Sequence, residues 1–333
     1  MNQSAVKRPP LPKHLYQLDA LRGGLFVAYS LLMFVVPAYL ATRVLSSGLP
    51  LAAQLLLFVP LWLLCQQGLH LLGWVGHEGT HLNLHRNKYV SAFAGTLLSS
   101  AIPGFINFGA ALSHWVHHRY TNQPSDPHTV MFPQFKGFWS RAIFARPLAT
   151  RMYSKDAFRV ALNRGLSYKT GLSFSPRMMR VLAWTNIVCT GLFLILYLTL
   201  TVAMPLEMIV ALWIPYLLTV VHSGLRIYIE HAGTGIGTFR DSRTYSSPLF
   251  TALYFGNNYH LEHHLYPVVP CYHLPAVHRH LRDLGIFDRM DSPIDRRASQ
   301  YLAPTTALMP YPTARGADSN DDPYQVTSLA VEG

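Results

Sequence analysis

The chain has 333 residues, of which 50% are hydrophobic and only 13% are Asp, Glu, Lys or Arg. Soluble domains carry about twice this charged fraction, so the composition argues against an ordinary soluble protein and for a membrane protein. The net charge of +11 does not indicate a nucleic-acid partner, because no basic helix with interleaved aromatic residues is present. The three cysteines are scattered, so neither a disulfide framework nor a thiolate metal site is indicated.

Two apolar runs of membrane-spanning length follow a basic N-terminal arm of residues 1–22. The runs cover residues 23–42 and 49–74, and the link between them holds a single basic residue, Arg43. Because cytoplasmic segments carry the excess of Lys and Arg, we expect the arm in the cytoplasm. It has no small-residue cleavage signature, so we expect no cleaved signal peptide. The second run then delivers His77 and His81 to the cytoplasmic surface.

Residues 90–112 are apolar enough to span a membrane, yet they lie between two clusters of histidines. A single crossing would put His81 and His114 on opposite sides of a hydrocarbon core about 30 Å thick. If these clusters share one metal centre, the segment between them must be re-entrant or lie in the membrane interface. Pro103 and Gly104 support a bend within it.

The second half of the chain begins with a basic and aromatic segment, residues 132–180. This composition is typical of a cytoplasmic membrane-surface region, for which a solvated basic loop and a role in substrate docking are both open. Apolar runs at 181–203 and 206–228 form a second predicted hairpin, which returns Glu230 and His231 to the cytoplasmic side. A short helix is expected near residues 274–284, and residues 303–333 have the composition of a disordered tail.

The predicted fold is therefore all-α and multi-pass. It has four transmembrane helices arranged as two hairpins, an interfacial or re-entrant helix, and a cytosolic cap rich in histidine. The membrane domain covers residues 23–302, and both termini are expected in the cytoplasm. No internal repeat or second folded domain is evident.

The spacing of the histidines carries the functional information. One stretch has histidines at i, i+3 and i+4, which puts three imidazoles on one face of a helix, and the same spacing occurs once earlier. At this composition only about 0.04 copies of the pattern are expected by chance. A looser pair at i, i+4 precedes both. The eight histidines with ligand spacing are His77, His81, His114, His117, His118, His260, His263 and His264.

Eight imidazoles exceed the three or four protein ligands of one tetrahedral zinc ion, so two metal ions fit the set better. Imidazole binds zinc, copper, iron and nickel alike, which leaves the element open.

Two other kinds of protein could use such histidines. Residues 77–81 match the H-E-x-x-H pattern of zinc proteases, with Glu78 as the general base, but a protease leaves both H-x-x-H-H boxes unexplained. A metal transporter would place polar residues at mid-membrane depth in several crossings, whereas these boxes lie at or beyond helix ends.

The three boxes together resemble a known family. His-Glu-Gly-Thr-His at 77–81, Ser-His-Trp-Val-His-His-Arg-Tyr-Thr-Asn at 113–122 with Asp126-Pro127, and Asn-Tyr-His-Leu-Glu-His-His-Leu-Tyr-Pro at 258–267 are similar to the histidine boxes of the membrane fatty-acid desaturase/hydroxylase superfamily. The resemblance implies a non-haem di-iron enzyme that uses O2 and external electrons to attack an unactivated C–H bond of a lipid-like chain. Tyr228-Ile229-Glu230-His231 resembles the Y-x-E-H motif of the alkane-hydroxylase branch, which adds His231 as a ninth ligand.

Within this superfamily the His-Leu-Glu-His-His box favours fatty-acyl desaturation. The alternatives are hydroxylation or ketolation of an alkyl, carotenoid or other apolar substrate. A separate electron-transfer protein of the ferredoxin, rubredoxin or cytochrome type is expected, since neither terminus contains a recognisable donor segment. The side chains expected to fix the ligand rings by hydrogen bonds, with an ordinary capping or surface role as the alternative, are Glu78, Asp126, Glu230, Asn258 and Glu262.

The remaining histidines are not expected to bind metal. His70 and His222 lie within apolar runs, where hydrogen bonds between helices explain an ionisable side chain. His85 is expected at the surface or behind the ligands. Three more lack ligand spacing and are expected at the surface: His273, His278 and His280.

Overall fold

The computed structural model describes residues 7–313, which are mostly helical. Within that range, the two strands β1 (Thr244–Tyr245) and β2 (Ile294–Asp295) are short and pair in parallel. The predicted all-α fold with four helical stretches long and apolar enough to cross a membrane is confirmed. These stretches are α1 (Ala20–Leu45), α2 (Leu51–Thr80), α7 (Pro176–Ala203) and the combined stretch Pro205–His231.

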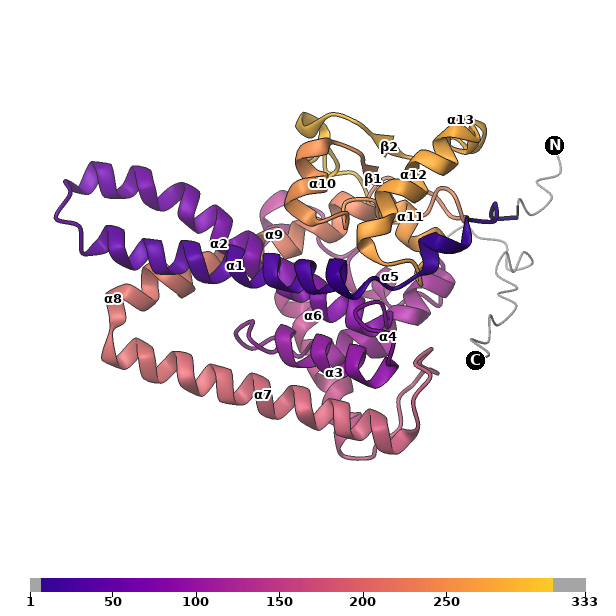
Figure 1. The fold of residues 1–333 in the computed structure, drawn as a ribbon. Helices are drawn as coiled ribbons and strands as arrows, with labels where there is room; N and C mark the ends of the chain where they lie inside the picture. The colour runs from indigo at the N-terminus through magenta and orange to yellow at the C-terminus, as the bar shows by residue number, and fades with distance from the viewer. Residues whose placement is uncertain (1–6, 314–333) are drawn as a thin grey trace.

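Helices α1 and α2 lie side by side and are joined by a short turn (Figure 1). Asp19 caps α1 by accepting hydrogen bonds from the backbone N–H groups of Leu21 and Arg22, at 2.9 and 3.2 Å. The two backbones approach closely at Gly68, where a Cβ atom would lie 2.2 Å from the backbone nitrogen of Phe34. Small residues at such a crossing allow the close packing that holds helices together in lipid.

The outer faces of the long helices are apolar and exposed. Leu56 on α2 is 76% exposed and Val202 on α7 is 86% exposed, and many neighbouring leucines and valines are exposed as well. Exposed apolar surface of this extent marks a lipid-facing or partner-facing region rather than one in contact with water. This surface agrees with the membrane association predicted from the sequence.

The last apolar stretch is interrupted, because Pro215 has no backbone N–H to donate to the carbonyl of Ala211 one turn earlier. The Sγ atom of Cys65 on α2 lies 3.4 Å from that carbonyl oxygen and compensates for the missing donor. A π-helical turn at this point absorbs the disruption. The stretch therefore consists of α8 (Pro205–Met208), the π-turn η2 (Ile209–Trp213) and α9 (Ile214–His231).

The ambiguous segment 90–112 is broken into two helices, α3 (Lys88–Ser99) and α4 (Asn107–Tyr120). Gly104 lies between them with φ +67°, so the chain bends where Pro103 and Gly104 predict it. Helix α3 crosses α2 closely: a Cβ atom on Gly79 would lie 2.7 Å from the Cα atom of Gly95. This crossing fixes the end of α2 that carries the first histidine box.

The remaining elements gather at the end of the molecule where α1 begins, opposite the α1–α2 turn (Figure 1). The predicted helix near residues 274–284 is confirmed as α12. These elements are η1 (Lys13–Tyr16), α5 (His128–Met131), α6 (Phe138–Ala161), α10 (Pro248–Tyr254), α11 (His260–Leu265), η3 (Cys271–His273), α12 (Leu274–Asp283), α13 (Ile286–Met290), η4 (Ala298–Gln300) and α14 (Ala303–Thr306).

The expectation of a disordered tail from residue 303 is wrong for residues 303–313. The guanidinium of buried Arg141 on α6 donates to the carbonyl oxygens of Pro304 and Met309, at 3.3 and 2.7 Å, and Tyr311 is buried. The carbonyl oxygens of this segment satisfy the buried guanidinium of Arg141, and these hydrogen bonds order the segment although its composition resembles that of a loop. The rest of the predicted tail, 314–333, and residues 1–6 of the predicted arm lie outside the described residues.

Candidate metal centre

The predicted histidine ligands come from four helices that meet at one place. His77 lies in the last turn of α2, and His81 is the residue directly after this helix. Helix α4 carries the second box, α11 carries the third, and His231 is the last residue of α9. Helix ends and two short helices thus bring together all nine histidines named from the sequence.

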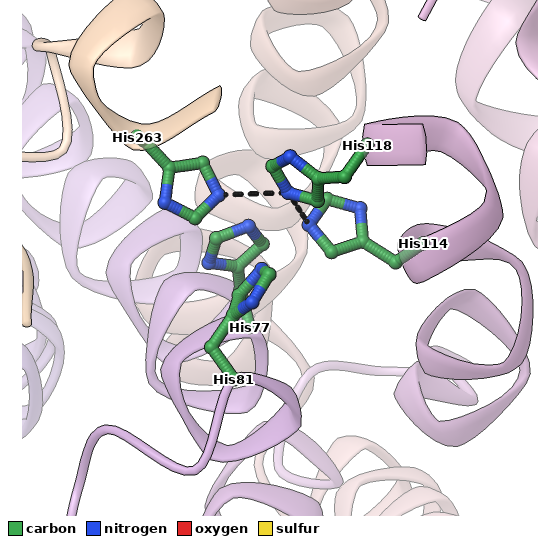
Figure 2. A group of neighbouring side chains, drawn as sticks. All are labelled: His77, His81, His114, His118 and His263. Atoms are coloured by element: carbon green, nitrogen blue, oxygen red, sulfur yellow. Dashed lines mark hydrogen bonds between the residues drawn. The ribbon is translucent and has the colours of Figure 1, made fainter. Parts of the chain in front are cut away.

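Five of these histidines form one group, which we call the five-histidine group: His77, His81, His114, His118 and His263. Their ligand nitrogens all lie within 4.8 Å of one another, and Figure 2 shows the rings turned toward a common point. The Nε2 atom of His118 is 2.9 Å from Nε2 of His114 and 3.0 Å from Nε2 of His263. Two nitrogens bound to one ion at about 2.1 Å and at right angles would be about 3 Å apart.

The other four form the four-histidine group: His117, His231, His260 and His264. The ligand nitrogens of His117, His231 and His264 lie within 4.8 Å of one another. The Nε2 atom of His260 is 3.1 Å from that of His231 and 3.2 Å from that of His264. The two groups are neighbours, because the consecutive pairs His117–His118 and His263–His264 contribute one residue to each.

The residues fit metal ions. His77 and His81 have no hydrogen-bond partner for either ring nitrogen among residues 7–313, although these atoms are buried. Burying polar atoms without partners is costly, and an ion would satisfy them. Burial lowers the pKa of His114 to about 3. Burial, and to a smaller extent the neighbouring imidazoles, lowers the pKa of His263 well below its usual value. The rings are therefore neutral at physiological pH and keep lone pairs for a metal.

Hydrogen bonds orient the rings of the four-histidine group from behind. The Nδ1 atom of His117 lies 2.9 Å from a carboxylate oxygen of Asp126, and Nδ1 of His264 lies 3.1 Å from the hydroxyl of Thr121. Nδ1 of His231 lies 3.0 Å from the backbone carbonyl oxygen of Asp241. Partners of this kind fix the tautomer of a ligand and aim its Nε2 atom at the ion.

Comparison with known proteins gives one decisive result. The model of the fatty acid desaturase family matches residues 50–296. The chain belongs to the fatty acid desaturase family. Membership implies an oxidoreductase that oxidises lipid chains at a histidine-rich metal site. A search of curated proteins finds no match to the chain.

Two of the acids expected behind the desaturase ligands lie close to ligand rings without forming short hydrogen bonds to them. The Oε1 atom of Glu230 is 2.7 Å from the guanidinium of Arg226 and 3.6 Å from Nδ1 of His260. In Glu78, one carboxylate oxygen accepts from the backbone N–H of Cys271 at 3.0 Å, and the other is 3.4 Å from Nδ1 of His77. Of the five predicted side chains, Asp126 makes the direct contact with a ligand.

Asn258 and Glu262 hold the third box in place through other residues. The side-chain amide of Asn258 donates to the backbone carbonyl of Tyr245 at 2.6 Å. Glu262 accepts a hydrogen bond from the hydroxyl of Thr244 and lies 2.5 Å from Nδ1 of His278. Both side chains therefore tie α11 and its preceding loop to β1 and α12.

The expectation that His278 lies at the surface is wrong. It is only 7% exposed, because α12 packs its apolar face on the core and carries His278 inward to Glu262. The expectations for His70, His85 and His222 agree with the structure, while His273 and His280 are partly exposed. His85 is exposed, and Nδ1 of His70 on α2 lies 3.2 Å from the hydroxyl of Ser223 on α9. The ring of His222 bonds to the hydroxyl of Tyr254 at 2.9 Å.

His128 also lies at the site, although no ligand spacing in the sequence indicates it. Its ring centroid is 4.0 Å from that of His117, and its ligand atom groups with those of His117 and Asp126. The hydroxyl of Tyr153 lies 3.3 Å from Nε2 of His128. His128 has no histidine at i±3 or i±4, and its place two residues after Asp126 is the one signal that the sequence offers.

A cavity of about 180 Å³ opens beside both histidine groups. His77, His114 and His117 line it on the metal side. Apolar side chains from α2, α9 and the α3–α4 bend line the rest, among them Leu69, Ile102, Phe105, Val220 and Ile227. A slot with apolar walls and metal ligands at one end suits an alkyl chain.

Proposed function

We propose that this chain is a non-haem di-iron enzyme that desaturates fatty acyl chains with O2. The observation that carries the proposal is the division of nine histidines into adjacent groups of five and four beside an apolar cavity. Two neighbouring groups fit two ions, and imidazole is a suitable ligand for iron. Iron bound there supplies the oxidising chemistry, with O2 as the oxidant.

The balance of the reaction explains why a partner is needed. A –CH2–CH2– unit loses two hydrogens to become –CH=CH–, and these combine with O2, two protons and two electrons to form two water molecules. The electrons come from an external donor, for which we propose a separate protein of the ferredoxin, rubredoxin or cytochrome type. The residues of the chain do the positioning: Asp126 holds the N–H of His117, and the walls of the cavity exclude water from the alkyl chain.

We also propose that α1 with α2, and α7 with α8 to α9, cross the membrane as two hairpins. The histidine groups and both termini then lie on the cytoplasmic side, where a soluble donor has access to them. The distribution of basic residues supports this orientation, because Arg43 in the last turn of α1 is the one basic residue near the α1–α2 turn, whereas the arm before α1 holds several. Helices α3 and α4, with the bend at Gly104, would lie in the interface.

Hydroxylation is the second candidate, and the Tyr228-Ile229-Glu230-His231 motif favours it. The same cavity and ligands serve either reaction, which differ in whether the substrate loses a second hydrogen or gains oxygen. A zinc protease is less well supported, because one oxygen of Glu78 accepts from the backbone of Cys271 and its neighbour His77 faces three histidines from other helices. A general base needs a free carboxylate beside the metal-bound water.

The test is expression in a host with a suitable electron donor, followed by mass spectrometry of the lipids. Loss of two hydrogens supports desaturation, and gain of oxygen supports hydroxylation. His263→Ala should abolish either product, whereas His85→Ala, at an exposed position, should not. The proposal would be contradicted if the protein bound one zinc ion per chain and the His263→Ala variant kept full activity.

A further inference from the structure

The cavity beside the histidines contains a cation that the proposed reaction does not use. Arg146 lies on α6, lines the cavity and is half-buried. Its guanidinium lies 4.0 Å from the ring centroid of Phe105, which is a cation–π contact. This contact occupies one face of the guanidinium and leaves its N–H donors free.

Arg146 differs from the other arginines near it. Among residues 7–313 it has no carboxylate within ion-pair distance and no hydrogen-bond acceptor. Arg226, which also lines the cavity, pairs with Glu230 at 2.7 Å, and Arg141 on the same helix as Arg146 donates to three backbone carbonyls. Burial lowers the pKa of Arg146, although an arginine remains charged at physiological pH. A half-buried cation in the wall of a cavity, with no anion beside it, is a binding group for one.

The wall of the cavity leads from Arg146 to the histidines. Arg146 and Tyr153 are seven residues apart on α6, so they lie on one face of the helix about 10 Å apart. The hydroxyl of Tyr153 is 3.3 Å from Nε2 of His128, whose ring lies against that of His117. An anion on Arg146 would therefore be on the order of 10 Å from the four-histidine group, along the same cavity.

We propose that Arg146 binds the carboxylate of an unesterified fatty acid, and that the substrate of this enzyme enters the cavity as the free acid. This inference rests on the proposed oxidation of fatty acyl chains. The planar guanidinium matches a carboxylate with two parallel hydrogen bonds. A phosphate monoester carries close to two charges and calls for more than one unpaired cation. An acyl ester or thioester is uncharged at its carbonyl group, so it would leave this cation without an anion.

A fixed carboxylate also determines where the chain is oxidised. The distance from Arg146 to the histidines is set by α6, so the reacting carbons lie at a constant number of bonds from the carboxyl end. Fatty acids of different length should then be oxidised at the same position counted from that end. An enzyme that locates its substrate by the methyl end would shift the position with chain length.

Binding can be measured without O2 or reductant, so the result does not depend on catalysis. We would compare radiolabelled palmitate, hexadecanol and the monophosphate ester of hexadecanol on the purified full-length protein in maltoside micelles, which contain no phosphate. A charge-assisted pair predicts that palmitate binds about tenfold more tightly than the alcohol. Arg146→Gln should remove this difference, and Arg146→Lys should retain part of it. Arg151→Gln, an exposed arginine on the same helix, is the matched control.

Each outcome is decisive. Equal binding of acid and alcohol by the wild-type protein would overturn the inference, and this comparison holds even if Arg146→Gln does not fold. An unchanged preference in folded Arg146→Gln, or tighter binding of the phosphate ester, would also overturn it. None of these results would affect the proposed oxidation. Conversely, the protein could bind palmitate in a manner that depends on Arg146 and yet oxidise no lipid. That result would contradict the proposed function but not the role of Arg146 in binding.

Discussion

The Nδ1 atom of His117 lies 2.9 Å from Oδ2 of Asp126, and both side chains are buried. The same carboxylate accepts hydrogen bonds from the backbone N–H groups of Asn122 and His128, each at 2.9 Å. Asp126 therefore joins the end of α4 to the start of α5 and at the same time fixes a ring of the four-histidine group. Its role combines the folding of a loop with the orientation of a proposed metal ligand.

Asp126→Asn should weaken metal binding and loosen the loop between α4 and α5, because one of its two acceptor oxygens becomes an N–H donor. The amide keeps the size of the side chain but loses the charge that holds the ring N–H of His117. Losing such a partner typically costs about 10- to 100-fold in metal affinity or activity. Iron content of the purified protein and turnover are the measurements, with exposed Asp283→Asn as control. Equal iron content and activity in the two variants would show that the contact is unimportant.

Removing one histidine from either group should lower the metal content selectively. His118→Ala takes one ligand from the five-histidine group and His264→Ala takes one from the four-histidine group. If each group holds one ion, elemental analysis should find the iron per chain reduced toward half in both variants. His85→Ala should match the wild type, because that residue is exposed. Full metal content in either ligand variant would refute this division of the ligands.

His278→Ala should destabilise the protein although His278 belongs to neither histidine group. It leaves the buried carboxylate of Glu262 without its partner on α12. Leaving a buried hydrogen-bonding group without its partner typically costs about 1–3 kcal/mol. Thermal unfolding in detergent measures the effect, and His280→Ala, at a less buried site on the same helix, is the control. Indistinguishable melting of the two variants would mean that the pair contributes nothing.

Gly68→Ala should loosen the packing of α1 on α2. The added methyl group would lie 2.2 Å from the backbone nitrogen of Phe34, so one helix must move. Overpacking of this kind typically costs about 1–3 kcal/mol. Gly191→Ala on α7 is a matched control, because a Cβ atom there meets nothing within 4 Å. The control should melt at the wild-type temperature or above it, since alanine favours a helix over glycine by about 1 kcal/mol.

Ligand spacing explains why the sequence reveals so much of the site. Histidines at i, i+3 and i+4 share a helix face whatever the surrounding fold, so both H-x-x-H-H boxes can be recognised from the order of residues alone. Hydropathy likewise predicts the four long helices, since spanning a membrane requires length and apolar composition in one continuous segment.

Residues that act through tertiary contacts could not be predicted. His128 has no spacing partner, and it reaches His117 because Asp126 folds the loop between them. His278 has the appearance of a surface residue on a short polar helix, yet Glu262 draws it inward. The segment after residue 303 lacks periodicity, and the donors that order it belong to Arg141, more than 160 positions earlier. Such contacts join distant parts of the chain and leave no local pattern.

The order of the ligands along the chain has a consequence for biosynthesis. His263 completes the five-histidine group and His264 completes the four-histidine group, and both residues follow all four candidate membrane spans. During synthesis, the histidines of α2, α4 and α9 therefore emerge from the ribosome before those of α11. We expect iron to be loaded only after synthesis of α11, so that a chain truncated before residue 260 should insert into the membrane but retain no stable metal centre.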